Sequence, residues 1–302
     1  TFLSSSISRS EEHTSDWSSD VCSSDLEMLE LRNVTKRFGD TIAVNNVSTN
    51  FEPGQMVGVI GRSGAGKSTL LRLINRLATA DEGKITSGEI DVRSLSGTQL
   101  RAWRARCAMI FQQFNLVNRL DVLTNVLIGR IGNAGTVPVM FKHFSATDRA
   151  NAAMALDRLD LLSQALQRAD TLSGGQQQRV AIARALMQKP TIILADEPIA
   201  SLDPRNARLV MEALRTINQQ DKITVITNLH TLDAARAYCD RIIGMAHGHV
   251  VFDGTPDMLT SSMIQQIYGD EHETAVDERL TSTIAATGTA GQAGKRHLEA
   301  AH

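Results

Sequence analysis

The segment Met56–Ala78, MVGVIGRSGAGKSTLLRLINRLA, contains the strongest structural signal in the chain. Its first five residues are apolar and predict a buried strand, while Lys67–Ala78 places apolar residues at helical spacing. Between them, GRSGAGKST matches the pattern GxxxxGK[ST] in the order of strand, loop and helix that this phosphate-binding motif requires. The segment therefore predicts an α/β domain with a largely parallel sheet.

The loop residues are of the types that phosphate binding needs. Gly61, Gly64 and Gly66 let the backbone bend until successive N–H groups point at phosphate oxygens. Lys67 supplies a point charge for the β and γ phosphates, and the Ser68 hydroxyl is placed to ligate Mg²⁺. A Gly-rich turn that only caps a core helix is the weaker alternative, because strand, loop and helix all agree. The predicted nucleotide-binding positions here are Gly61, Arg62, Ser63, Gly64, Ala65, Gly66, Lys67, Ser68 and Thr69.

A second apolar run, Thr191–Ala195, leads directly into two adjacent acids in the sequence TIILADEP. Carboxylates are costly to bury without charge partners, so the pair indicates a site at this strand end. Asp196 is expected to hold Mg²⁺ through water, opposite Ser68. Glu197 is expected to point elsewhere, because neighbouring strand residues alternate sides, and to polarise the water that attacks the γ phosphate. An acid pair that merely caps the next loop is the alternative.

A second candidate anion-binding helix start lies in Leu172–Met187, LSGGQQQRVAIARALM. Ser173 is a natural N-cap, and Gly174 and Gly175 expose backbone N–H groups ahead of an apolar helical pattern. One phosphate chain does not need two such helix starts from one subunit. Two copies facing head to tail, each nucleotide held between the first start of one copy and the second of the other, would use both. The sequence therefore predicts a dimer.

Together, GRSGAGKST, LSGGQ and, about twenty positions later, ILADEP resemble the ATP-binding cassette (ABC) ATPase family. The resemblance extends from about Met28 to Tyr268. It implies a P-loop NTPase (RecA-like) core with an antiparallel β subdomain and an inserted helical subdomain. It also implies ATP and Mg²⁺ as ligands, and hydrolysis of ATP coupled to transport across a membrane.

Further positions take on roles through this resemblance. Phe38, in TKRFGD, matches the aromatic residue that stacks on adenine, with an ordinary core Phe as the alternative. Gln112, in MIFQQF, matches the glutamine that senses the γ phosphate and Mg²⁺ and contacts the transmembrane partner. Gln176 completes the LSGGQ motif. Asp203, in ASLDP, matches the loop that couples the two sites of the dimer. His230, at the end of a β-like run, matches the switch histidine at the γ phosphate, with a structural histidine as the alternative.

A narrower resemblance is to the ATPase subunits of bacterial phosphonate importers, in MIFQQFNLVNRLDVLTNVLIGRIG, LSGGQQQRVAIARALMQ and ILADEPIASLDP. It implies a transmembrane permease and, indirectly, a periplasmic solute-binding protein as partners. ATP sites do not contact the transported molecule, so import of phosphate, phosphite or a polar amino acid stays open. A soluble cassette acting on nucleic acid or ribosomes is a third possibility, disfavoured because the chain has neither a second cassette nor a coiled-coil insertion. An ATP-switched scaffold is a fourth.

Composition limits the setting. The 302 residues are 42% hydrophobic with a net charge of −2, so the chain has material for a core but no broad basic footprint for nucleic acid. No apolar run approaches the roughly 18 residues of a membrane span, so the chain is expected to be soluble by itself. Three scattered cysteines, Cys22, Cys107 and Cys239, indicate no disulfide framework or zinc site and fit a reducing cytoplasm. With the family resemblance, this places the chain peripherally on the cytoplasmic face of the bacterial inner membrane.

Patterning also predicts the organisation of the chain. Residues 1–27 are rich in Ser and acids and resemble translated sequencing-adapter sequence, so a disordered or artefactual extension before Met28 is expected, a flexible native tail being the alternative. Residues 28–270 are expected to form the ATPase domain and residues 271–302 a flexible tail.

Within the expected domain, Leu29–Val34 and Ile42–Phe51 alternate like antiparallel strands. A mostly helical subdomain is expected over about residues 114–170, with a break at Asn133–Pro138. Just after the break, the aromatic-flanked Val139–Phe144 is interpreted either as a surface near the membrane partner or as ordinary helix packing.

Overall fold

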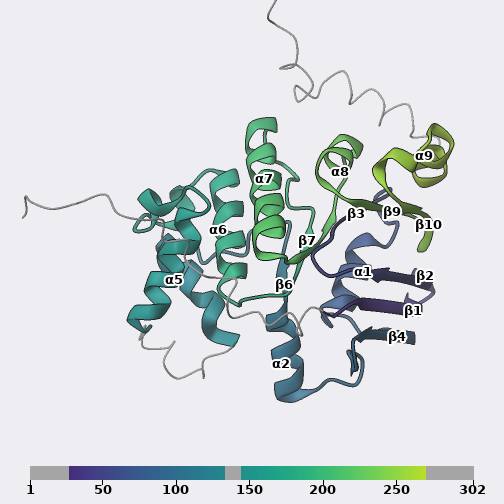
Figure 1. Cartoon of the computed structure of the whole chain (residues 1–302), viewed down its shortest axis with the longest axis horizontal. Helices are drawn as coiled ribbons and strands as arrows, with labels where there is room; N and C mark the ends of the chain where they lie inside the picture. Colours follow the sequence, from purple (N-terminus) through teal and green to yellow (C-terminus); the bar gives the residue numbers. More distant parts are fainter. Residues whose placement is uncertain (1–26, 133–143, 270–302) are drawn as a thin grey trace, which may run out of the picture.

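The computed structural model describes residues 27–132 and 144–269 and contains two β-sheets, with helices packed on both faces of the larger one (Figure 1). The strands are β1 (Leu29–Phe38), β2 (Thr41–Phe51), β3 (Met56–Ile60), β4 (Glu82–Ser87), β5 (Ile90–Asp91), β6 (Cys107–Ile110), β7 (Ile192–Asp196), β8 (Thr224–Asn228), β9 (Arg241–Ala246) and β10 (His249–Gly254). The α-helices are α1 (Lys67–Ile74), α2 (Gly97–Arg106), α3 (Val122–Leu127), α5 (Ala146–Asp157), α6 (Gly174–Leu186), α7 (Pro204–Asp221), α8 (Leu232–Tyr238) and α9 (Ser261–Tyr268). Short 3-10 helices are η2 (Ile128–Gly132), η3 (Leu162–Gln164), η4 (Ala169–Thr171) and η5 (Pro256–Met258).

The larger sheet has the strand order β10-β9-β3-β8-β7-β6. Its strands β6, β7, β8, β3 and β9 are parallel, and only β10 pairs antiparallel, with β9. Every residue of β3, β7 and β8 is buried, as continuous apolar strands covered on both faces should be. The α/β class and the largely parallel sheet expected from the sequence are therefore confirmed.

The two faces of this sheet have different cores. Met56 and Ile60 of β3 face a cluster that contains the apolar sides of α6 and α7, while Val57 and Val59 face a cluster with α1 and the smaller sheet. This alternation follows from the two-residue period of a strand. Helices α1 and α6 consequently lie on opposite faces of the sheet.

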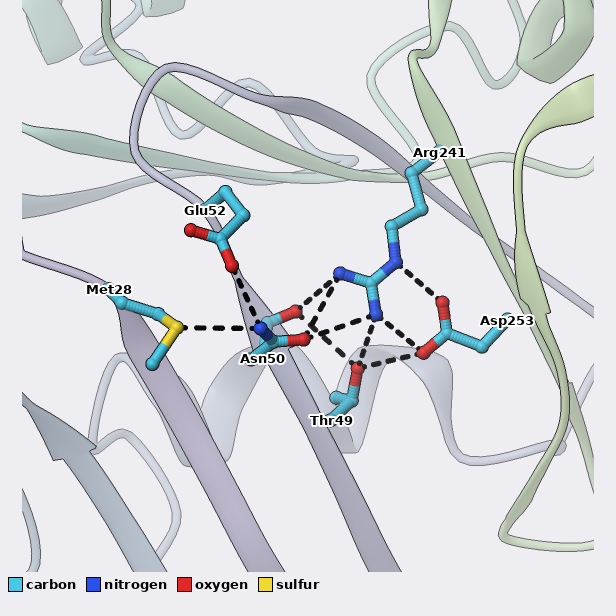
Figure 2. A network of polar contacts seen from close by, with 6 residues as sticks. All are labelled: Met28, Thr49, Asn50, Glu52, Arg241 and Asp253. Atoms are coloured by element: carbon cyan, nitrogen blue, oxygen red, sulfur yellow. Dashed lines mark hydrogen bonds and ion pairs between the residues drawn. The ribbon is translucent and has the colours of Figure 1, made fainter.

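The smaller sheet, β2-β1-β4-β5, is antiparallel, as the alternating N-terminal strands predict. Figure 2 shows the polar network that joins it to the larger sheet. Arg241 of β9 donates to the backbone oxygen of Asn50 in β2 (2.9 Å) and to the Asp253 carboxylate in β10 (2.6 Å). Thr49 of β2 also donates to Asp253 (3.1 Å). One guanidinium thus connects three strands of two sheets.

Helix α1 ends earlier than the sequence pattern predicts. The apolar spacing indicated a helix to Ala78, but the last helical residue is Ile74 and Asn75 is the C-cap. Arg76 follows with a φ of 64°, in the left-handed region, which ends the helical hydrogen-bond ladder. Leu77 and Ala78 therefore lie beyond the helix and the turn that ends it.

Helices α3 and α5 pack together and against α6, within the stretch where a helical subdomain is expected. The predicted break at Asn133–Pro138 and all but the last residue of Val139–Phe144 lie outside the described residues. So do residues 1–26 and 270–302. Phe144 itself packs against the core cluster beneath α6. Among the helices that the structure describes, none has the length and apolarity that crossing a bilayer requires.

Candidate functional site

The loop of residues 61–66, predicted from the sequence to bind phosphate and called the phosphate loop below, connects β3 to α1 and depends on glycine at two close approaches. Gly61 and Gly66 have φ values of 149° and 102°, which L-residues with side chains rarely adopt. A Cβ on Gly61 would overlap the backbone oxygen of Met245, and one on Gly66 would overlap that of Ala43. The loop thus lies directly against the backbone of β9 and β2 and has no room for a side chain at either position.

Lys67 is buried inside the loop, with only 4% of its surface exposed. Its Nζ donates to the backbone oxygens of Gly61 (2.7 Å) and Arg62 (2.9 Å). Burial lowers the pKa of Lys67, and the nearby carboxylates of Glu197 and Asp196 act in the opposite direction. The loop therefore holds the Lys67 ammonium group on neutral carbonyl oxygens. The side chain can exchange these for a charged oxygen of a ligand.

Ser68 and Asp196 meet although 128 positions separate them. Ser68 Oγ donates to Asp196 Oδ1 (2.7 Å), and Asn228 Nδ2 donates to the same oxygen (2.7 Å). Asp196 and Asn228 are register partners at the carboxyl ends of β7 and β8, which explains their closeness. Arg72 of α1 lies 4.0 Å from the other oxygen of Asp196. The sequence analysis missed Asn228, whose signal was a polar residue ending an apolar strand.

This cluster fits a small, hard divalent cation. Ser68 and Asp196 offer a hydroxyl and a carboxylate, and oxygen donors of this kind are the ligands that Mg²⁺ takes in proteins. Asn228 Oδ1 is buried and has no hydrogen-bond partner within the described part of the chain. An unsatisfied buried carbonyl oxygen is costly, so a further polar group beside it is expected.

Glu197 and His230 form a second pair next to the first. His230 Nε2 lies 2.6 Å from Glu197 Oε1, and the side chains are 46% and 17% exposed, respectively. Glu197 has a φ of 54°, uncommon for a residue with a side chain and typical of functional sites. Strand alternation was expected to set the direction of the Glu197 side chain. Because β7 ends at Asp196, the left-handed backbone at Glu197 sets that direction instead. A carboxylate held beside an imidazole can position a water molecule and accept its proton.

The LSGGQ segment begins α6, and Ser173 is its N-cap, as predicted. Gln176 N donates to Ser173 Oγ (3.3 Å) and Ser173 N donates to Gln176 Oε1 (2.9 Å), which completes a capping box. Gly174 lies against Leu202, and a Cβ on Gly175 would overlap the Asn206 side chain.

Asp203 caps the neighbouring helix α7 through the Asn206 amide N–H (3.1 Å). The hydrogen bond from the Asn206 side chain is the main cause that lowers the pKa of Asp203. Because Gly175 packs on Asn206, the starts of α6 and α7 lie side by side, as Figure 1 also shows for the two helices. These starts belong to the opposite sheet face from α1 and its loop.

Two predicted residues lie apart from this cluster. Phe38 ends β1 and is 55% exposed, so the alternative of a core phenylalanine is wrong. The ammonium group of Lys36 lies 5.2 Å from the centroid of the Phe38 ring. Gln112 follows β6 and is exposed, and its side chain forms no hydrogen bond with any other described residue. Gln112 therefore forms no hydrogen bond with Ser68 or Asp196 in the structure.

The chain is similar to several known proteins. The family profile described as ABC transporter matches residues 44–200. The phosphonates import ATP-binding protein PhnC of Rhizobium meliloti (strain 1021) is 61% identical over 256 residues, covering 85% of this chain and 91% of that protein. PhnC of Agrobacterium fabrum (strain C58 / ATCC 33970) is 61% identical over 254 residues, covering 84% and 89%.

A solved structure is also similar, that of the dimeric post-hydrolysis state of the ATP-binding cassette MJ0796 bound to ADP and Pi. It matches with a TM-score of 0.64 and 36% identity, over 76% of this chain and 98% of that one. The fold class expected from the sequence is the one these cassettes have.

Proposed function

Because this chain belongs to the ABC transporter family of ATP-binding cassettes, we propose that it is the ATP-hydrolysing subunit of a bacterial phosphonate importer. The reaction would convert ATP, water and external phosphonate into ADP, phosphate and internal phosphonate. The observation on which hydrolysis rests is the Glu197–His230 pair, held beside the Ser68–Asp196 pair at the ends of adjacent strands. The solute is inferred from the names of the relatives, since no residue of an ATP site needs to contact it.

The loop residues 61–69 would surround the phosphate chain, with backbone N–H groups and Lys67 directed at its oxygens. Ser68 and Asp196 would hold Mg²⁺, with Gln112 as a further candidate, and the ion would neutralise phosphate charge. Glu197 orients the attacking water and takes its proton as the water oxygen bonds to the γ phosphorus and the bond to ADP breaks. His230 would contact the γ phosphate, and Phe38, exposed at the end of β1, would stack on adenine.

A second copy of the chain would complete each site. Ser173, Gly174, Gly175 and Gln176 lie at a helix start on the opposite sheet face from the phosphate loop, so a partner arranged head to tail supplies them. Asp203, at the adjacent start of α7, would couple the two sites. The dimeric state of the MJ0796 cassette supports dimerisation of this chain.

The remaining partners follow from membership of an import complex. Two such cassettes would attach to permease subunits at the cytoplasmic face of the inner membrane, and the permease would receive solute from a periplasmic binding protein. Nucleic acid is not among the proposed partners. Closure of the dimer around ATP would be transmitted to the permease through the segment after Gln112 and reversed by hydrolysis.

Replacing Glu197 with Gln tests the hydrolytic step. The amide cannot accept the proton of water, so ATP turnover by the assembled transporter should fall by about 10²–10⁴ while ATP binding persists. Glu212→Gln on the exposed face of α7 is the matched control and should leave turnover unchanged. A Glu197→Gln transporter with the parental turnover would refute the assignment.

Uptake identifies the solute. A strain lacking this chain should lose uptake of a labelled phosphonate and regain it with the parental gene but not with the Glu197→Gln gene. Loss of phosphate, phosphite or amino-acid uptake instead, with phosphonate uptake intact, would reject phosphonate as the solute.

A further inference from the structure

The last described helix, α9, packs directly on the larger sheet. Its residues Ile264, Ile267 and Tyr268 are buried in the same cluster as the apolar sides of α6 and α7, while Ser261, Ser262, Gln265 and Gln266 are exposed. The buried face contacts β9 and β10. Figure 1 shows α9 over that edge of the sheet.

The C-terminal end of α9 reaches the base of the phosphate loop. The Ile267 side chain occupies the space that a Cβ on Gly244 would need, and Gly244 of β9 is the register partner of Ile60, the residue immediately before the loop. Just beyond α9, the position of a Cβ on Gly269 lies 3.3 Å from a guanidinium nitrogen of Arg62, within the loop.

The same end of α9 also contacts the loop that contains His230. The Tyr268 hydroxyl donates to the backbone oxygen of His230 at 3.5 Å, a long hydrogen bond from a ring that is only 7% exposed. His230 lies between β8 and α8, outside both elements, and its own side chain is 46% exposed. At the far end of α8, Arg236 donates to the backbone oxygen of Leu259 (3.1 Å), in the turn leading to α9. The segment 259–268 therefore contacts both the loop before α8 and the last turn of α8.

We propose that α9 is part of the ATPase machinery and that Tyr268 is a positioning residue for His230. The inference rests on the proposed function and adds an element to it. Leu229, directly before His230, is held to β3 by its hydrogen bond to the Val59 backbone oxygen (3.0 Å), but His230 itself lies in no strand or helix, so its backbone orientation depends on further contacts. The buried, rigid phenol of Tyr268 supplies one such contact, while Ile267 and Gly269 place the same helix against the phosphate loop. Helix α9 thus sets how His230 faces Glu197 and the loop.

Tyr268→Phe is the test, because it removes the hydroxyl and keeps the buried ring. In the assembled transporter, kcat for MgATP should fall about 2- to 3-fold, the low end of the effect of one lost hydrogen bond because this bond is long, with KM for ATP unchanged because the loop around Lys67 is intact. Tyr238→Phe is the matched control: Tyr238 is the chain's only other tyrosine, lies half-buried on α8, and should keep the parental kcat and KM. Arg236→Met, which frees the far end of α8, should lower kcat in the same way.

A second readout separates positioning from general loosening. Backbone hydrogen exchange of residues 229–235 should become faster in Tyr268→Phe than in Tyr238→Phe, while residues 61–69 exchange at the parental rate. Parental kcat in Tyr268→Phe, or a parallel change in kcat and KM, would overturn the proposal, as would a loss matched by Tyr238→Phe. ATP turnover of the parental and Glu197→Gln transporters is measured in parallel, under the same conditions. The proposed function therefore stands or falls separately from the role of Tyr268.

Discussion

Lys67 is a residue whose burial costs free energy and whose charge suits the proposed phosphate site. Burying an ammonium group is unfavourable unless hydrogen bonds and opposite charges compensate it. The carbonyl groups of Gly61 and Arg62 supply the hydrogen bonds, and Asp196 and Glu197 supply the charge nearby. Charged phosphate oxygens would accept from Lys67 more strongly than neutral carbonyls do, so the residue is prepared for an anion.

Lys67→Ala is therefore predicted to abolish nucleotide binding. The variant loses the buried cation and leaves the two acidic side chains without its charge, which would repel a phosphate chain. Titration with a fluorescent ATP analogue measures the effect, and Lys84→Ala, an exposed lysine of β4, should bind as the parent does. Unchanged affinity in Lys67→Ala would mean that the loop is not the phosphate site.

Helices α6 and α7 begin in the same way. Each has an exposed polar residue at its N-cap, and the first backbone N–H groups of each helix have no acceptor within the helix itself. Ser173 and Asp203 each accept from the backbone N–H three residues on. Capping satisfies these N–H groups in the single chain, yet the remaining first-turn N–H groups of α6 still point outward with the positive end of the helix dipole. A helix start of this kind can stabilise its own helix and receive an anion from a second chain.

Ser173→Ala should separate these two contributions from each other. Loss of the cap should lower the free energy of unfolding by about 1 kcal/mol, and loss of the hydroxyl at the proposed interface should also weaken ATP-driven dimerisation of a Glu197→Gln background. Ser145→Ala is the matched control, because Ser145 caps α5 with the same geometry, accepting from Asp148 N at 3.0 Å. It should show the stability loss alone, by urea unfolding, and keep dimerisation by light scattering. Equal dimerisation of the two variants would contradict the head-to-tail site.

The molecule as a whole is held together across its two sheets by a few polar contacts and a shared core. Arg241 reaches from β9 to β2 and β10, and its side chain is 17% exposed. Ion pairs in such places are screened less than surface pairs and fix orientation as well as contributing energy. The antiparallel sheet holds Phe38 and packs beside α1, so its orientation matters for the proposed adenine contact.

Arg241→Met is predicted to lower the free energy of unfolding by about 1.5–3 kcal/mol, the range for hydrogen bonds to charged groups. Arg32→Met is the control: among the described residues the Arg32 side chain pairs with Glu30 of the same strand and is 67% exposed, so its loss should leave the free energy of unfolding nearly unchanged. Urea unfolding of both variants measures the difference. Equal losses would show that the network in Figure 2 does not hold the sheets together.

Several features could be predicted from neighbouring residues alone. The strand Met56–Ile60 and the start of the next helix at Lys67 lie where the apolar pattern and the glycines place them. Ser173 caps its helix because a Ser-Gly-Gly-Gln sequence satisfies the first turn locally. The end of α1 was predicted wrongly, since the left-handed turn at Arg76 interrupts a pattern that would otherwise continue to Ala78.

Local sequence was sufficient for the phosphate loop, the strand-end acids and the helix caps, because φ preferences, side-chain period and capping act over a few residues. Long-range packing was needed for the contacts of Asp196 with Ser68 and Asn228, for Glu197 beside His230, and for Tyr268 against the His230 loop. Those contacts depend on strand order and register, and on the face of the sheet that each helix covers. Register is set by hydrogen bonds between strands far apart in the chain, so no short segment contains that information.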